Sequence, residues 1–246
     1  MKKIIIIGAG AMGSAFAVPC VDNKNDVTIV GTHLENDLIE KIKSNDQIHP
    51  ALKTKLSSEV KFEKFEKLQT ILDQDIDIIV CGVSSIGIEW FVQQISKKYK
   101  KGLPIILLTK GLSILDNELT TLSDKIRTLL SKDGHSEINI SAIKGPCLAA
   151  GLANKMRTGT IIANQKVKEA QLLKGIISTN YYSTEISEDI NGVELSGAIK
   201  NIYSMLIGAS EGLSNSKVPK EIQSKFFLNT AASLIHRSIS EMVEFV

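Results

Sequence analysis

The run KIIIIGAGAMG at residues 3–13 constrains the fold more than any other part of this chain. Its uncharged isoleucines predict a buried strand, and Gly8, Gly10 and Gly13 follow directly with G-x-G-x-x-G spacing. A helical pattern begins at once and continues to residue 22. In this context the first glycine permits a tight turn, the second lets the backbone approach a pyrophosphate, and the third lets the helix pack on the strand. The free N–H groups at the helix start would then bind the anion, with Ala11 and Met12 completing the loop.

The same run has a second interpretation as a secretory signal. Two lysines precede it, residues 4–21 carry no charge, and AFAVPC at 15–20 has the small residues of a cleavage site. Three glycines make a poor signal core, and the rest of the chain favours an interior strand. A secreted protein therefore remains the remote alternative.

Short apolar runs alternate with helical patterns as far as residue 188. This alternation predicts βαβ units and a mostly parallel, Rossmann-type sheet, an α/β fold. After residue 188 the alternation stops, which predicts a dinucleotide-binding domain over 1–188 and a partial all-helical domain over 189–246. The predicted strands are 3–7, 26–30, 59–62, 75–83, 104–109, 138–143, 159–163 and 181–186. The predicted helices are 11–22, 34–45, 86–98, 116–131, one between the last two strands, 190–213 and 220–246.

Composition excludes several classes of function. The net charge of +2 gives no electrostatic case for binding nucleic acid. The three cysteines, Cys20, Cys81 and Cys147, are widely spaced and predict a reducing, cytoplasmic location without a disulfide framework. The four histidines show no metal-ligand spacing, so no metal is expected. Beyond the first segment, nothing predicts a membrane span.

The coenzyme's ribose contact is less well defined. An NAD site commonly offers an acidic residue at the end of the second strand. Here that stretch reads Gly31-Thr32-His33, with Glu35 slightly later, and no arginine is placed to receive a 2′-phosphate. Thr32 or His33 would hydrogen-bond the ribose, so NAD and NADP both stay open, with NAD slightly favoured.

Two lysines stand where ligands bind in open α/β sheets, beyond the carboxyl ends of the strands. Lys110 directly follows the predicted strand at 104–109. Lys200 is the only charged residue from 195 to 209, in a segment so apolar that a buried helix is expected. Burial would lower the pKa of a lone amine toward the range useful for proton transfer. The bland alternatives are a solvated loop lysine for Lys110 and a lysine that snorkels to the surface for Lys200. Glu194 could help position Lys200.

Together these motifs resemble those of NAD(P)-dependent glycerol-3-phosphate dehydrogenases, over essentially the whole chain and closest to the archaeal branch. The motifs are GAGAMGSAFA at 8–17, GVSS at 82–85, LLTKGL at 107–112, GPCLAAGLA at 145–153, GVELSGAIKNIYSMLIGASEGL at 192–213 and NTAASLIHRSISEM at 229–242.

The resemblance implies reversible hydride transfer between NAD(P)H and dihydroxyacetone phosphate, in glycerophospholipid metabolism. It implies Lys200 as the catalytic acid and base, and Lys110 as a second active-site lysine that orients the substrate. Asn201 would bind the small phosphorylated three-carbon substrate. The coenzyme would contact Ser84, Ser85 and the glycine loop. A homodimer is the expected assembly.

The sequence also departs from the family pattern. Cys147 and Gly151 stand where the family has a hydroxyl residue and a glutamate, and members usually continue past residue 246 with a segment that grips the substrate phosphate. The chain ends on an apolar helical stripe, which predicts a fragment, a shortened product or a face covered by a partner. The stripe consists of Ile235, Ile239, Met242, Val243 and Val246.

Two other functions are alternatives to this one. A dinucleotide-binding or assembly protein without turnover would fit the missing phosphate-gripping segment. A ketopantoate or 3-hydroxyacid reductase would share the architecture, but the Thr-Lys-Gly and Lys-Asn motifs disfavour it.

Overall fold

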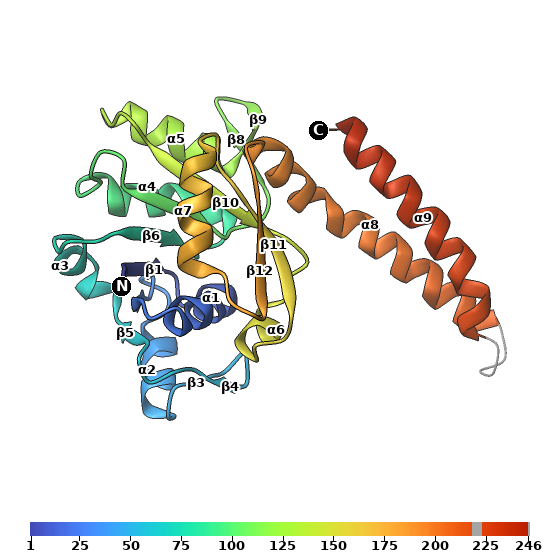
Figure 1. Ribbon diagram of the computed structural model, residues 1–246, viewed down its shortest axis with the longest axis horizontal. Helices are drawn as coiled ribbons and strands as arrows, with labels where there is room; N and C mark the ends of the chain where they lie inside the picture. Colours follow the sequence, from blue (N-terminus) through green and yellow to red (C-terminus); the bar gives the residue numbers. More distant parts are fainter. Residues whose placement is uncertain (218–222, 246) are drawn as a thin grey trace.

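The computed structural model describes residues 1–217 and 223–245, and it describes side chains outside 214–227. An eight-stranded sheet forms its centre, in the order β12-β11-β10-β7-β6-β1-β2-β5 (Figure 1). The six strands from β10 to β5 run parallel, and β11 and β12 run antiparallel to them. The parallel part follows the strand order of a Rossmann fold, with β1 near its middle. The expected α/β class is confirmed.

The principal strands are β1 (Lys3–Ile7), β2 (Asp26–Val30), β5 (Lys61–Glu63), β6 (Ile78–Cys81), β7 (Pro104–Leu107), β10 (Asn139–Lys144), β11 (Thr158–Ala163) and β12 (Tyr182–Ser187). Two hairpins lie outside this sheet. They pair β3 (Ile48–His49) with β4 (Thr54–Lys55), and β8 (Leu112–Leu115) with β9 (Glu118–Thr121).

Two layers of helices cover the sheet. On one face α1 (Ala11–Asp22), α2 (Asn36–Ser44), α6 (Ala149–Ala153) and α7 (Val167–Ile177) enclose one apolar core. On the other face α3 (Leu68–Leu72), α4 (Ile88–Ser96) and α5 (Leu122–Lys132) enclose a second core. Short 3-10 turns, η1 (Phe65–Lys67) and η2 (Ser85–Gly87), precede α3 and α4. Strand β1 belongs to both cores, since its isoleucines point alternately to the two faces.

The first segment is a central strand and not an exported signal core. Ile4 to Ile7 are fully buried and pair in parallel with β2 on one side and β6 on the other. Helix α1 has the bounds predicted from the sequence, and it is buried along most of its length.

The helix predicted over 116–131 is wrong at its start. Residues 118–121 form strand β9, and α5 begins only at Leu122. Asp116 and Asn117 both have positive φ, of 50° and 66°, as a two-residue type I′ hairpin turn requires. Asp-Asn is a turn signal of this kind, so local turn chemistry overrides the helical periodicity that follows it. The short elements β3, β4, α3 and α6 were not predicted either.

The last two helices, α8 (Ile190–Lys217) and α9 (Gln223–Phe245), pair as a long hairpin that projects away from the sheet (Figure 1). The expectation of a buried α8 holds only for its first turns, which include Gly192, Glu194 and Gly197. Further along, Ile202 and Met205 are exposed. The apolar side chains in this later part of α8 therefore form a surface that the described residues leave uncovered. Within the predicted stripe, Val246 lies outside the described residues.

Candidate active site

The glycine turn is as tightly built as a phosphate-binding turn requires. Gly8 has φ of +111°, a conformation that side-chain-bearing residues rarely adopt. A Cβ on Gly13 would lie 2.4 Å from the Gly8 carbonyl oxygen, so only glycine lets α1 approach β1 this closely. Helix α1 starts at Ala11, and its N-cap Gly10 offers no side-chain cap to the first N–H groups. An uncapped helix start beside a glycine turn fits the pyrophosphate of a dinucleotide.

Glu35 lies on this turn, although the sequence placed it later than a ribose-binding acid. Its Oε2 accepts hydrogen bonds from the backbone N–H groups of Ala9, at 3.0 Å, and Thr32, at 2.8 Å. A Cβ on Gly10 would lie 3.8 Å from Oε1 of the same side chain. The end of β2 carries no acidic residue. Instead Glu35, the N-cap residue of α2, places a carboxylate on the glycine turn.

His49 supports the glycine turn by a hydrogen bond to its backbone, a role that the sequence did not indicate. Its ring is buried, and Nε2 donates to the Ala9 carbonyl at 3.0 Å. Nδ1 accepts from the backbone N–H groups of Ala51 and Leu52, which sets the tautomer with the proton on Nε2. The β3–β4 hairpin that carries His49 was not predicted, so no local signal pointed to this contact.

The other predicted coenzyme residues lie at the ends of neighbouring strands. The exposed His33 forms a three-ring cluster with the half-buried Phe65 and Trp90, with ring centroids 5.4 to 6.0 Å apart. Ser84 caps the 3-10 turn η2 with its backbone, and Ser85 faces Gly111 across the gap between β6 and β7. Such flat aromatic surfaces beside an α/β switch point are suited to stacking a planar base.

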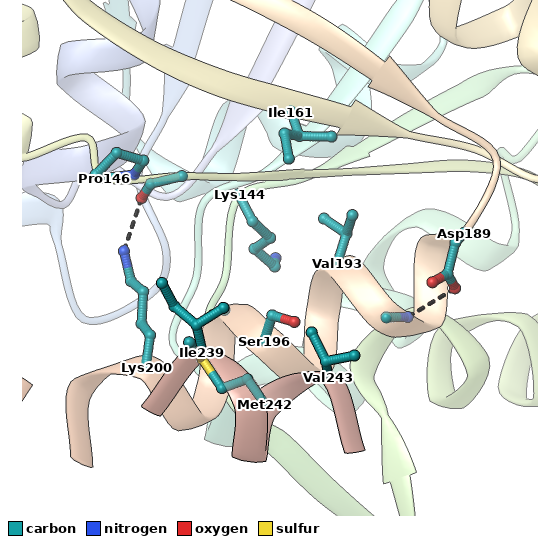
Figure 2. A pocket seen from close by; sticks show the side chains of 13 residues that line it. Lys144, Pro146, Ile161, Asp189, Val193, Ser196, Lys200, Ile239, Met242 and Val243 are labelled. Atoms are coloured by element: carbon teal, nitrogen blue, oxygen red, sulfur yellow. Dashed lines mark hydrogen bonds between the residues drawn. The ribbon is translucent and has the colours of Figure 1, made fainter. Parts of the chain in front are cut away.

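Lys110 and Lys200 come from distant parts of the chain but lie near enough for the charge of one to act on the other. The Lys200 amine donates to the Gly145 carbonyl at 2.9 Å (Figure 2). Burial lowers the pKa of Lys200, and the positive charge of the neighbouring Lys110 lowers it further. Asn201 is exposed and does not line the cavity beside Lys200.

A cavity of about 530 Å³ adjoins Lys200, between the end of β10 and the α8–α9 hairpin. Its walls are mainly apolar and include Val193, Ile239, Met242 and Val243 (Figure 2). The glycine turn is not part of this cavity. Lys200 lines this apolar space, whereas Lys110 does not.

Two buried charged residues lie near the lysines: Lys144, which the sequence did not single out, and Glu194, which it suggested as a partner of Lys200. Lys144, the last residue of β10, is 4% exposed, and its amine donates to the Thr109 carbonyl at 2.5 Å. Glu194 is fully buried and accepts from the backbone N–H of Ser123 at 3.2 Å. Glu194 thus interacts with Lys144 and not with Lys200.

Cys147 is buried, and burial raises the pKa of its thiol. It is therefore a packed thiol and not a stabilised thiolate. Within the described part of the chain, no three His, Cys, Asp or Glu side chains cluster as metal ligands. Within the same residues, no helix combines the length and apolarity needed to cross a bilayer.

Comparisons with known proteins agree on one family. The family described as NAD-dependent glycerol-3-phosphate dehydrogenase N-terminus matches residues 3–170, and its C-terminus counterpart matches residues 189–246. An NADP(+)-dependent glycerol-3-phosphate dehydrogenase of Archaeoglobus fulgidus is 33% identical over 243 residues, covering 99% of this chain and 69% of that protein. A glycerol-3-phosphate dehydrogenase [NAD(P)+] of Mesoplasma florum is 29% identical, covering 99% and 68%.

The structural comparison points the same way. The crystal structure of a glycerol-3-phosphate dehydrogenase from Coxiella burnetii has a TM-score of 0.79, at 22% identity, and the match covers 100% of this chain and 68% of that one. At this identity the similarity establishes the fold.

Proposed function

Because this chain belongs to the NAD-dependent glycerol-3-phosphate dehydrogenase family, we propose that it interconverts dihydroxyacetone phosphate and sn-glycerol 3-phosphate with NAD(P)H. The observation that carries the proposal is the placement of the Lys200 amine on the Gly145 carbonyl beyond the end of β10, with Lys110 near enough for its charge to lower the pKa of Lys200. In this fold a ligand lies at that edge, beside the phosphate-binding turn.

The residues of the chain divide the chemistry between them. When bound, the coenzyme supplies or accepts the hydride. Lys200 donates its ammonium proton to the oxygen of the substrate carbonyl as that carbon is reduced, and takes the proton back in the reverse direction. Lys110 attracts the phosphorylated substrate and stabilises the developing oxyanion. Asn201 is a proposed contact to the substrate. The proposed contacts to the coenzyme are the glycine turn, Thr32, His33, Ser84 and Ser85.

The lowered pKa of Lys200 supports its role in this proposal. An amine whose pKa is lowered gives up and takes back its proton more readily than an ordinary lysine does. Burial and the charge of Lys110 both act in this direction. The alternative of a dinucleotide-binding protein without turnover is not favoured, since the matched family is one of dehydrogenases over both parts of the chain.

The test is oxidation of NADH driven by dihydroxyacetone phosphate, with ketopantoate as the control substrate. Replacing Lys200 with alanine should lower kcat by about 10²- to 10⁴-fold, the usual contribution of a general acid. NADH binding should be retained. Lys41→Ala, on the exposed face of α2, is the matched control and should leave kcat unchanged. Binding of NADH by the unmodified chain with no turnover of dihydroxyacetone phosphate would contradict the proposal.

The assembly, location and domain boundary are also proposals. A homodimer would cover apolar side chains exposed on α8 and α9. A cytoplasmic location agrees with three cysteines that are buried and free. A boundary near residue 188 is supported by the end of the last strand at Ser187, after which only α8 and α9 follow among the described elements.

A further inference from the structure

We infer that Lys144 and Glu194 form a buried pair that positions Lys110 and Lys200 for the proposed reaction. The inference rests on the proposed function for its meaning, and it is argued from the hydrogen bonds of Lys144, from the burial of Glu194 and from the electrostatic coupling of the two charges. Both are proposed as positioning residues, because the hydrogen bonds of Lys144 go to backbone carbonyls and that of Glu194 comes from a backbone N–H group.

Lys144 fixes the backbone that leads into Lys110. It is the last residue of β10, and β7 is the neighbouring strand in the sheet. Its amine reaches across to the end of β7 and donates to the carbonyl oxygens of Thr109, at 2.5 Å, and Leu107, at 3.4 Å. Thr109 directly precedes Lys110. A charged donor on that carbonyl therefore restrains the position from which the Lys110 side chain departs.

Lys144 also sets how closely α8 approaches the sheet. A Cβ on Gly197 would lie 3.3 Å from both Cγ and Cδ of Lys144, so the helix packs on the lysine stem where it has no side chain. Figure 2 shows the Lys144 side chain directed toward α8 beside Ser196. One helical turn later, Lys200 donates to the carbonyl of Gly145, the residue after Lys144. The Lys144–Gly145 segment thus contacts the backbone before Lys110 and the helix that carries Lys200.

Glu194 carries a negative charge on the face of α8 that also holds Gly197 and Lys200. Glu194, Gly197 and Lys200 are spaced by three residues each and so lie along one side of the helix. Glu194 is fully buried, and within the described residues its Oε1 has no hydrogen-bond partner. A buried carboxylate and a buried ammonium are each costly alone, and each stabilises the other. The pair therefore fixes α8 against β10 and β7.

The charges around the pair explain how it titrates. Lys144 faces Glu194 from α8, Cys81 from β6 and Lys110 after β7, and burial lowers the pKa of its amine to about 8. Glu194 faces Lys144 from β10 and Asp124 from α5, and burial raises the pKa of its carboxyl. Each partner's charge opposes the shift of the other, so removal of one partner should push the remaining one toward its neutral form.

The experiment is a double-mutant cycle with Lys144→Met, Glu194→Gln and the double variant. Two properties are measured: the kinetics with dihydroxyacetone phosphate, and the pH dependence of acylation of Lys200 by trace acetic anhydride, read by mass spectrometry. Each single variant should lower kcat by on the order of 10²-fold, the cost of a misplacement of about 1 Å, with KM for NADH nearly unchanged. The double variant should lose less than the two single losses combined.

The pH dependence of Lys200 acylation distinguishes a positioning role of Lys144 and Glu194 from a role in protein stability alone. If Lys110 is no longer held beside Lys200, the pH midpoint for Lys200 should rise, by roughly half a unit or more. Lys125→Met is the matched control, since Lys125 is also a buried, ion-paired lysine but bonds to Glu89 and Ser113. It should leave the Lys200 profile unchanged.

Outcomes against the inference are distinct from outcomes against the proposed function. Strictly additive kinetic losses, or an unchanged Lys200 profile in folded Lys144→Met and Glu194→Gln proteins, would overturn the positioning pair. The double variant keeps the test open if a single variant does not fold, because a neutral pair avoids an unpaired buried charge. Acylation needs no turnover, so a chain without dehydrogenase activity would sink the proposed function and still give a result here.

Discussion

At the scale of single residues, the site depends on charges placed where water is scarce. Lys200 is half-buried beside another lysine, Lys144 is almost wholly enclosed, and Glu35 is held over the glycine turn by two backbone N–H groups. Each of these groups is shifted or oriented by at least one neighbour that is distant in sequence. Their properties can therefore be tested one side chain at a time.

The pH dependence of the two reaction directions should differ in sign. Reduction needs the protonated Lys200, so kcat should fall as pH rises through its pKa. Oxidation needs the neutral amine, so kcat should rise over the same range. Because burial and Lys110 lower this pKa, both transitions should lie below the ordinary lysine value of 10.5. Initial rates across pH in both directions check this, and transitions at or above 10.5 would contradict the assignment.

Glu35 should influence the choice between NADH and NADPH. Its carboxylate occupies the place where a ribose-binding acid is needed, and it would repel a 2′-phosphate. Glu35→Gln keeps an acceptor for the Ala9 and Thr32 N–H groups but removes the charge. We expect the affinity for NADPH relative to NADH to rise about tenfold, since one like charge near 4 Å is worth on the order of 1–4 kcal/mol.

The measurement for Glu35 is quenching of Trp90 fluorescence, because Trp90 is the single tryptophan of the chain and lies beside His33. Asp37→Asn, an exposed acid on the same helix, is the control and should leave the ratio unchanged. An unchanged ratio of NADPH affinity to NADH affinity in Glu35→Gln would mean that the 2′ position of the coenzyme ribose does not lie near Glu35.

At the scale of elements, close approach of backbones decides the geometry. The β1–α1 unit depends on Gly8 and Gly13, and the contact of α8 with β10 depends on Gly197. In each case a Cβ would meet atoms that have little room to move. The glycines therefore set the distance between elements that carry the functional groups.

Gly13→Ala should lower both stability and NADH affinity. The added methyl would lie 2.4 Å from the Gly8 carbonyl oxygen, which forces α1 away from the turn. We expect a loss of about 1–3 kcal/mol in the free energy of unfolding, as for overpacking. Gly175→Ala in α7 is the control, because its Cβ meets nothing within 4 Å and should stabilise the helix by about 0.4–1 kcal/mol. Denaturant melts and NADH titrations test both; equal behaviour of the two variants would refute the argument.

At the scale of the whole molecule, the sheet domain has two well-covered cores, whereas the α8–α9 hairpin leaves apolar side chains exposed. Ile235, Ile239 and Val243 lie at intervals of four on α9, each about half or more exposed. Exposed apolar stripes of this kind mark interaction surfaces. The proposed homodimer would bury this stripe.

Sedimentation velocity should therefore show self-association that depends on the hairpin. Ile239→Glu with Val243→Glu places two charges on the stripe and should shift the population toward monomer. Leu172→Glu, an equally exposed apolar position on α7, should have no such effect. A monomer at all concentrations for the unmodified chain would remove the homodimer from consideration.

The local signals of the sequence were sufficient for the parallel sheet and the glycine turn. The four isoleucines at 4–7, followed at once by the glycine turn, are typical of a strand buried on both faces, and that turn marks where α1 begins. Local signals failed at the β8–β9 hairpin, where a two-residue turn was read as the start of a helix. They also failed along α8, because an apolar composition does not show whether a helix is covered.

Within the candidate site, the sequence by itself determined which chemical groups are available: a phosphate-binding turn, Lys110 and Lys200. Only the tertiary structure decided which groups act on one another. It brought Glu35 to the turn, His49 beneath it, and Lys144 and Glu194 behind the two lysines. The physical reason is that local pattern encodes burial and backbone conformation, whereas a charge's partner depends on which chain segments the fold packs together.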